Sequence, residues 1–274
     1  MADQQKSDLV FAGSIPEIYE RSFVPLIFQP YADDLARRLF DLQPSTVLEI
    51  AAGTGVVTRA MADLLPAATE ITATDLNQPM LDFAASVGTS RPVTWRQADA
   101  MSLPFDDESF DAIACQFGAM FFPDRPTAYA EMRRVLRPGG VLLFNVWGAI
   151  EDNDFADVAT NALAALFPDD PPRFMARTPH GYHDRDRIRA DLAVAGFESA
   201  STIESVDARS RAATCMDAAI AYCQGTPLRN EIESRRPGAL AEATDVVAAA
   251  IGDLFGRTDV DGAIRALVVT ALKN

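Results

Sequence analysis

The sequence predicts an α/β protein with an open, doubly wound and mostly parallel sheet of seven strands, N-terminal helices and a helical insertion before the last strand. Two observations support this fold class. Between residues 45 and 147, short runs rich in β-branched residues alternate with helical patterns, which is typical of βαβ units around a buried parallel sheet. The composition, 49% hydrophobic over 274 residues with a net charge of −15, is that of a globular protein.

Five strands are expected in the alternating stretch, at residues 46–50, 70–74, 93–97, 110–115 and 140–146. Helices are expected at residues 53–65, 78–87 and 125–136. The last of these should end at Arg137-Pro138-Gly139-Gly140, because proline and glycine terminate helices.

The segments on either side are predicted to be mainly helical. Residues 15–42 contain Pro16, Pro25 and Pro30, which should divide them into short helices before a longer helix at 31–40. Beyond residue 150, helices are expected at 154–167, 184–195, 212–224 and 238–255, and strands at 197–208 and 266–272. We find no linker that would divide the chain, so we expect one domain over 1–274, with segments 1–42, 43–150 and 151–274.

Charge and hydropathy exclude several classes of function. An excess of 39 acidic over 24 basic residues disfavours a nucleic-acid partner and leaves small molecules or proteins. The longest apolar run, residues 141–150, is about half the roughly 20 residues that cross a bilayer. The polar N-terminus predicts a cytoplasmic location. The spacing of Cys115, Cys215 and Cys223 indicates reduced thiols and no metal site.

A glycine-containing loop after the first strand is the most informative motif. The stretch Val47–Thr58 runs from an apolar strand through a turn of small residues into a helix, which places backbone N–H groups at the edge where such sheets bind ligands. Three features follow in order: Asp75, twenty residues after Gly55, Asp99 after the third strand, and residues 114–118 after the fourth. Carboxylates at these places can accept hydrogen bonds from a ribose and from an adenine amine.

These residues resemble the class I S-adenosylmethionine-dependent methyltransferases, in particular the group of ubiquinone and menaquinone biosynthesis C-methyltransferases. The resemblance covers roughly residues 15–147. It rests on Glu49–Gly55, Asp75, residues 99–111 and Leu136–Gly140. It implies a Rossmann-like methyltransferase fold with N-terminal lid helices, S-adenosyl-L-methionine as cofactor, and methyl transfer to a small-molecule acceptor by in-line displacement.

The resemblance also implies roles for single residues. The loop from Ala51 to Gly55 would face the methionine part of the cofactor, Asp75 would hold the ribose, and the Gln116 region would meet the amino group. Leu76 and Met80 would pack near the adenine, whose edge Asp99 and Ala100 would bind. The full expected set is Tyr19, Glu49, Ala51, Gly53, Thr54, Gly55, Asp75, Leu76, Asn77, Met80, Ala98, Asp99, Ala100, Gln116 and Phe117.

One residue departs from the family pattern. Ala51 stands where the family usually has glycine, and we expect its methyl group to tighten the approach of the backbone to the cofactor. Structural readings also stay open for three acids: Asp75 as a solvated carboxylate, Asp99 as a turn residue, and Glu49 as a group that orients the loop or caps a helix.

Two other functions compete with methyl transfer. An NAD(P)-dependent oxidoreductase would explain Gly53-x-Gly55-x-x-Thr58 followed by Asp75, but Thr58 stands where the dinucleotide fingerprint has its third glycine. A catalytically silent S-adenosylmethionine-binding protein would carry the same motifs, because the motifs report binding and not turnover.

The acceptor side of the site is less defined. We expect acceptor residues in the N-terminal segment with Tyr19, Phe28 and Tyr31, in 151–177 and in the helices of 212–255. Phe117, Phe121, Phe122 and Trp147 are candidates for core or pocket wall, and His180 and Tyr182 for its border. His183 precedes an expected N-cap, Asp184, and should pack; two histidines do not indicate zinc. The acceptor, its methylated atom, a catalytic base and the oligomeric state, a homodimer included, stay open.

Overall fold

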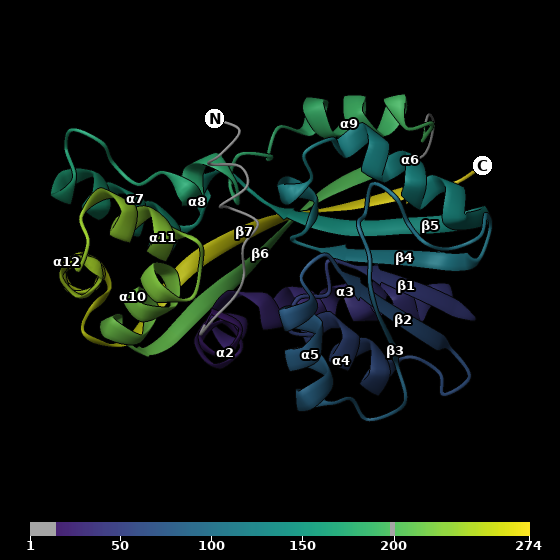
Figure 1. Ribbon diagram of the computed structural model, residues 1–274, viewed down its shortest axis with the longest axis horizontal. Helices are drawn as coiled ribbons and strands as arrows, with labels where there is room; N and C mark the ends of the chain where they lie inside the picture. Colours follow the sequence, from purple (N-terminus) through teal and green to yellow (C-terminus); the bar gives the residue numbers. More distant parts are fainter. Residues whose placement is uncertain (1–14, 198–200) are drawn as a thin grey trace. The chain divides into compact units, whose positions relative to one another are not determined.

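The computed structural model describes residues 15–197 and 201–274. A seven-stranded sheet has the order β3-β2-β1-β4-β5-β7-β6 (Figure 1). The pairs β1–β2, β1–β4, β2–β3 and β4–β5 are parallel. The strands are β1 (Thr46–Ile50), β2 (Glu70–Asp75), β3 (Thr94–Gln97), β4 (Phe110–Gln116), β5 (Leu136–Trp147), β6 (Ser201–Thr214) and β7 (Thr258–Leu272). The expected α/β fold is confirmed.

Helices follow β1, β2 and β4 as expected, and further helices precede β1 and lie on either side of β6 in the chain. They are α2 (Ile15–Ile18), α3 (Gln29–Leu42), α4 (Val56–Leu64), α5 (Gln78–Val87), α6 (Arg125–Val135), α7 (Asp154–Leu166), α8 (Phe174–Arg177), α9 (Arg185–Val194), α10 (Cys215–Gln224), α11 (Leu228–Arg235) and α12 (Leu240–Phe255). A π-helix, η1 (Tyr19–Phe28), and two short 3-10 turns, η2 (Ala119–Phe121) and η3 (Ile150–Asp152), complete the elements. Asp184 caps α9 by accepting hydrogen bonds from the N–H groups of Asp186 and Arg187, as expected.

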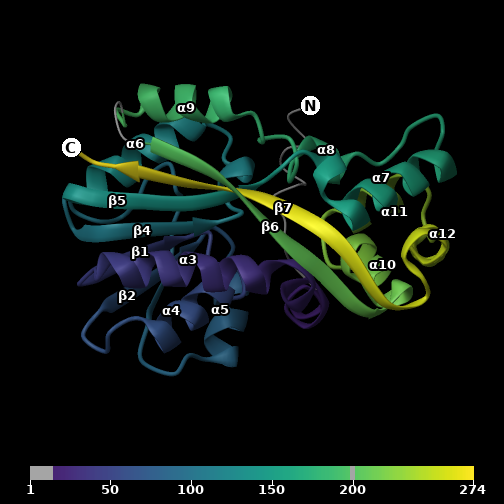
Figure 2. The same cartoon turned by 180° about the vertical axis from the view of Figure 1, so that it is seen from behind.

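The central strands β1, β4 and β5 are apolar and buried, because helices cover both faces of this part of the sheet. Figure 2 shows α3, α4 and α5 on one face and α6 and α9 on the other. Leu48, Ile113 and Phe144 on three neighbouring strands are fully buried. Sequence order reverses between β1 and β4, since β2 and β3 lie on one side of β1 and β4 and β5 on the other. Ligands of open α/β sheets bind at such a switch point, outside the carboxyl ends of the strands.

The N-terminal expectation was wrong in part, because two prolines do not interrupt helical structure as predicted. Pro30 occupies the first turn of α3, where a helix tolerates a residue without an N–H group. Pro25 lies inside the π-helix η1, and α3 extends to Leu42.

The boundaries of the last three strands also differ from the expectation. β5 begins at Leu136 and not at residue 140, because Leu136 already pairs with Phe110 of β4, and Gly139 and Gly140 exchange backbone hydrogen bonds with Lys273 (2.7 and 2.9 Å). β6 and β7 are 14 and 15 residues long, well beyond the expected 197–208 and 266–272. Residues 198–200 lie outside the described part of the chain. α8 and α11 were not expected.

The chain groups into two compact units. In the described residues, unit 1 comprises 15–28, 147–181 and 207–265, and unit 2 comprises 29–146, 182–206 and 266–274. Whether the chain is one domain stays a prediction. None of the described helices is both long and apolar enough to cross a bilayer.

Candidate functional site

The glycine loop joins β1 to α4 through a tight turn in unit 2. The backbone is left-handed at Ala51 (φ 56°) and at Gly55 (φ 86°). The N–H of Ala52 donates to the carbonyl of Thr74 (2.9 Å), which fixes the start of the loop to the end of β2. At Gly55 a side chain would also crowd Trp95, whose nearest atom would be 3.1 Å from the added carbon. Glycine is therefore required there by both backbone and packing.

Asp75 ends β2 and holds the glycine loop. Its side chain is buried, Oδ2 accepts a hydrogen bond from the N–H of Gly53 (2.9 Å), and Oδ1 accepts one from the N–H of Asn77 (2.8 Å). Burial raises the pKa of Asp75. The reading of Asp75 as a solvated carboxylate is therefore wrong. Oδ1 also accepts a longer contact from Nδ2 of Asn77 (3.5 Å), so the acceptor capacity left for hydroxyl groups of a ligand is mainly the second lone pair of Oδ2.

Glu49 acts on the helix that follows the loop. Its carboxyl is buried in β1 and accepts a hydrogen bond from the hydroxyl of Thr58, in the first turn of α4. Burial raises the pKa of Glu49 from an ordinary 4.5 to about 8. Of the two structural readings, orientation of the loop–helix segment fits this contact.

The protonated Glu49 predicts a dependence of stability on pH. The folded pKa of about 8 lies above the unfolded value of 4.5, so the folded chain holds a proton that the unfolded chain has lost between these values. The stabilisation is complete below the unfolded pKa and is lost as pH rises through the folded pKa. A Glu49→Gln variant should lack this loss.

Urea unfolding of wild type and Glu49→Gln at about pH 5.5, 6.5 and 8 tests this expectation. The free energy of unfolding of wild type, relative to that of the variant, should decrease by at least about 1 kcal/mol over this range. Titrating groups that do not interact with Glu49 cancel in the difference, whereas the charge of Asp75, which also raises the pKa of Glu49, is part of what the comparison measures. A constant difference would show that Glu49 is not protonated in the folded chain.

The residues expected around the adenine meet at the ends of β2 and β3. The N–H of Ala98 donates to the carbonyl of Asp75 (3.0 Å), and the side chain of Gln97 donates to the carbonyl of Leu76 (2.8 Å). Leu76 is 46% exposed and is therefore accessible at this edge. Met80 is buried in α5 and approaches Gly53.

Asp99 behaves as a turn residue in the structure. Its side chain is exposed, and Oδ1 accepts a hydrogen bond from the N–H of Met101 (2.9 Å). Ala100, next to it, is buried. The expected contact of Asp99 with an adenine amine stays a prediction.

Residues after β4 pack against the start of the glycine loop. A methyl group added to Gly118 would lie 2.5 Å from Cβ of Ala51 and 2.8 Å from Sγ of Cys115. The Ala51 methyl thus points toward the space that Gly118 leaves. The fold therefore accommodates alanine at position 51, where the family usually has glycine, because residue 118 has no side chain. The expected crowding of the cofactor by Ala51 stays a prediction.

Sequence reasoning included Gly118 only as the end of the stretch 114–118, and it missed Asn145. Asn145 is fully buried near the end of β5, where its Oδ1 accepts a hydrogen bond from the N–H of Phe117 (3.0 Å). Phe117 has a left-handed backbone (φ 50°), which this contact helps to hold. The sequence feature that could have identified Asn145 is its position as the one amide side chain in the otherwise apolar run 141–147.

Several predicted residues belong to unit 1 and are described there. The Tyr19 ring stacks on Phe28 (centroids 5.0 Å), and Phe28 contacts Trp147 (5.9 Å). Trp147 lies beside the buried His180 (5.9 Å), whose Nδ1 is 3.0 Å from the carbonyl oxygen of Gly148. The expected place of Tyr19 in the cofactor site stays a prediction.

The other residues proposed for the acceptor side of the site lie partly in the core and partly at the surface. Tyr182 is buried in unit 2 and donates a hydrogen bond to Asp191 (2.9 Å). Phe121 and Phe122 are half-buried. His183 is exposed, so the expected packing role was wrong. Among residues 15–197 and 201–274, no three His, Cys, Asp or Glu side chains are arranged to hold a metal ion.

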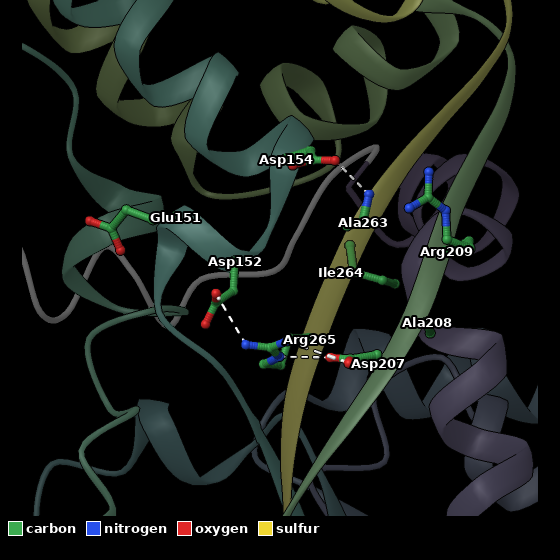
Figure 3. Close-up of a pocket in the computed structure, with 9 residues that line it drawn as sticks. All are labelled: Glu151, Asp152, Asp154, Asp207, Ala208, Arg209, Ala263, Ile264 and Arg265. Atoms are coloured by element: carbon green, nitrogen blue, oxygen red, sulfur yellow. Dashed lines mark hydrogen bonds and ion pairs between the residues drawn. The ribbon is translucent and has the colours of Figure 1, made fainter.

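A cavity of about 460 Å³ lies in unit 1, beside β6, β7 and the start of α7 (Figure 3). Arg265 pairs there with Asp207 (2.6 Å) and Asp152 (3.3 Å), and Asp154 accepts a hydrogen bond from the N–H of Ala263 (2.6 Å). These groups satisfy one another within the protein. The cavity contains none of the predicted cofactor residues.

The residues of the glycine loop fit a polar nucleoside cofactor. Thr54 is 1% exposed, and its hydroxyl has no hydrogen-bond partner among the described residues. Buried hydroxyl groups in proteins nearly always form hydrogen bonds. A bound ligand can supply the hydrogen-bond partner of the Thr54 hydroxyl if the loop shifts to expose it. Together with the acceptor capacity of Asp75 and the exposed Leu76, this matches a ligand with ribose hydroxyls and an apolar ring.

Comparisons with known proteins agree with this geometry. A family model described as "Methyltransferase domain" matches residues 48–144. The ubiquinone/menaquinone biosynthesis C-methyltransferases UbiE of Marinomonas sp. and Saccharophagus degradans are 32% and 31% identical over 168 and 164 residues, covering 57% and 55% of this chain and 67% and 66% of theirs. The YcgJ protein of Bacillus subtilis shares the fold (TM-score 0.56, 19% identity, 88% of this chain and 98% of that one).

The fold and the residues at the carboxyl ends of its strands define a class I S-adenosylmethionine-dependent methyltransferase domain. Within this class, the chain belongs to the family of UbiE. The match spans about two thirds of the length of these relatives.

Proposed function

We propose that the protein is an S-adenosyl-L-methionine-dependent methyltransferase that acts on a small-molecule acceptor. The observation that carries the proposal is the double hydrogen bonding of Asp75 to Gly53 and Asn77. These bonds join the loop after β1 to the end of β2 and leave a buried carboxylate with acceptor capacity for a ribose. Membership of the UbiE family supports the same cofactor.

The chain's own residues would bind and orient the cofactor. Asp75 would accept hydrogen bonds from the ribose, Leu76 and Met80 would pack against the adenine, and Asp99 with Ala100 would bind its edge. When bound, S-adenosylmethionine supplies an electrophilic methyl group, so the protein needs no nucleophile of its own. Its contribution is to align the acceptor for in-line displacement and to exclude water.

We assign acceptor recognition to unit 1. Its stretches 15–28, 147–181 and 207–265 include the segments for which the sequence gives no other role. They hold a connected aromatic cluster, in which Phe23 contacts Phe28 (5.3 Å) and Tyr222 (5.1 Å). Aromatic rings suit an apolar or planar acceptor. The names of the UbiE relatives make a quinone precursor one member of that class.

The proposal extends to location and partners. The described cysteines are free thiols, with Cys115 and Cys223 buried, which supports a reducing compartment such as the cytoplasm. The net charge of −15 argues against a nucleic-acid acceptor. A homodimer would be detected by light scattering after size exclusion.

Two measurements test the proposed function. Titration calorimetry should give micromolar binding of S-adenosylmethionine or S-adenosylhomocysteine and no binding of NADH. Binding of NADH alone would support an oxidoreductase instead. A screen of candidate acceptors should then release S-adenosylhomocysteine with at least one of them. Binding without turnover on any acceptor would favour the silent cofactor-binding protein.

A further inference from the structure

Arg125, the first residue of α6, holds the turn that follows β4. Its Nε donates a hydrogen bond to the carbonyl of Ala119 (3.2 Å), and its Nη2 donates one to the carbonyl of Met120 (2.9 Å). Ala119 and Met120 are buried residues of the 3-10 turn η2. A buried carbonyl group needs a hydrogen-bond donor, and the planar guanidinium of arginine can donate to two neighbouring carbonyls at once.

The face of the Arg125 guanidinium makes a second contact. It lies over the ring of Tyr182, 4.2 Å from the ring centroid, which is a cation–π contact. Tyr182 is buried, and its hydroxyl donates to the buried carboxylate of Asp191 (2.9 Å), which also accepts from Arg187 (3.0 Å). All these residues belong to unit 2. The position of Arg125 is therefore determined from two sides, by the turn and by a ring that is itself held in place.

The turn that Arg125 holds is continuous with a contact of the glycine loop. The N–H of Phe121 donates to the carbonyl of Gly118 (3.0 Å), so η2 begins at the residue that packs against Ala51. This packing is tight, because a carbon added to Gly118 would lie 2.5 Å from Cβ of Ala51. A shift of the turn after β4 would therefore move the start of the glycine loop.

We infer that Arg125 is a positioning residue for the amino-acid part of the cofactor, because it holds the turn after β4 against the glycine loop. This inference rests on the proposed function and on the expectation that the loop from Ala51 to Gly55 faces the methionine part. The adenosine part is assigned to the ends of β2 and β3, which lie on the other side of β1 from β4. Loss of Arg125 should therefore affect the two parts of the cofactor unequally.

Two other roles of Arg125 predict different results. If Arg125 only stabilised the fold, its loss would lower the melting temperature and either leave ligand affinity unchanged or weaken all adenosine ligands alike. If its positive charge attracted the ligand carboxylate from a distance, lysine would serve as well as arginine. Lysine has the same charge, but it lacks the planar fork and flat face that contact two carbonyls and the Tyr182 ring together.

Titration calorimetry with two ligands tests the inference on wild type, Arg125→Met and Arg125→Lys. S-adenosylhomocysteine has the amino-acid part, and 5′-methylthioadenosine lacks it. Arg125→Met keeps an apolar chain against Tyr182 and removes the donors, so it should weaken S-adenosylhomocysteine about tenfold, and Arg125→Lys should weaken it about fivefold. The affinity for 5′-methylthioadenosine should change less than about twofold in both variants.

Arg134→Met is the matched control on the same helix. Arg134 also donates to two backbone carbonyls, those of Leu103 (2.9 Å) and Phe105 (2.8 Å), but it lies in the last turn of α6, at the opposite end from Arg125. This variant should lower the melting temperature. Any loss of affinity that it causes should be equal for the two ligands.

Tyr182→Leu keeps Arg125 and removes the ring beneath it. It should weaken S-adenosylhomocysteine selectively, and it should add little in the Arg125→Met background. If Arg125→Met does not fold, Tyr182→Leu and Arg125→Lys decide by the same criteria. Equal weakening of both ligands by Arg125→Met, unchanged affinity for S-adenosylhomocysteine, or full affinity in Arg125→Lys would overturn the inference. No binding of either ligand to wild type would instead refute the proposed function.

Discussion

Gly118→Ala is expected to lower the free energy of unfolding by about 2–3 kcal/mol, the upper range for overpacking in a protein core. The backbone of Gly118 (φ −96°, ψ −35°) accepts alanine without strain, so the cost is steric. The added methyl would lie 2.5 Å from Cβ of Ala51 and 2.8 Å from Sγ of Cys115. Relief of these contacts would move the start of the glycine loop, and we also expect weaker binding of S-adenosylhomocysteine.

Gly118→Ala measured in an Ala51→Gly variant shows whether contact with the Ala51 methyl group causes the loss of stability. Ala51 has a left-handed backbone, which costs alanine about 1 kcal/mol, so glycine at this position stabilises the folded chain. Glycine also increases the entropy of the unfolded chain, which lowers the free energy of unfolding. The two effects oppose each other, so Ala51→Gly alone should be nearly neutral. In that background Gly118→Ala should cost clearly less, although the contact with Cys115 limits the recovery. Urea unfolding of the four proteins measures the coupling between the two sites.

Gly252→Ala is a suitable control for the loss of a glycine. It lies inside α12, where alanine favours the helix by about 1 kcal/mol, and its added methyl would be 3.3 Å from Sγ of Cys215. We expect it to stay within about 1 kcal/mol of wild type. If Gly118→Ala costs the same with Ala51 and with Gly at that position, then the contact between the two methyl groups is not the cause.

The predictable part of this protein is the part in which local sequence determines structure. The glycine loop and Asp75 were identified because the loop, the strand end and the spacing between them all lie within one βαβ unit, residues 46–75. Local rules also gave Asp184 as an N-cap, since the helix start and its capping side chain are neighbours in sequence.

The failures depend on partners that are distant in sequence. The expected strand ended at residue 208 and the next helix was expected from residue 212, yet β6 continues to Thr214, and its Arg209 and Arg211 pair with Asp261 of β7 (2.6 and 3.1 Å). Strand formation there depends on residues about fifty positions away. The Asn145 amide is a similar case, because its partners Gln116 and Phe117 lie at and just after the end of β4 and not beside it in sequence.

The role of Asp75 gives the second large effect, in cofactor affinity. Asp75→Ala is expected to weaken S-adenosylhomocysteine binding by about 1–3 kcal/mol, or roughly 5- to 150-fold. It removes acceptors for the ribose and also the anchor for the Gly53 N–H (2.9 Å). Calorimetry on the folded variant measures the change.

Asp75→Asn distinguishes the two contributions. If Asp75 only bound ribose hydroxyls, then an amide could still accept from one hydroxyl and donate to the other, and the loss would be small. The carboxylate, however, accepts from the N–H groups of both Gly53 and Asn77 with its two oxygens. An amide must present NH₂ to one of these donors, so Asn should weaken binding almost as much as Ala.

Asp111→Asn is the matched control, because Asp111 also accepts two backbone hydrogen bonds, from Ser45 and Thr46 (both 2.9 Å), and pairs with Arg137. It lies near the start of β4, at the end of the strand away from the glycine loop. This variant should lower the melting temperature and leave the affinity for S-adenosylhomocysteine unchanged. An Asp75→Asn variant that binds as tightly as wild type would show that the ribose contact, and not the loop anchor, is the function of this carboxylate.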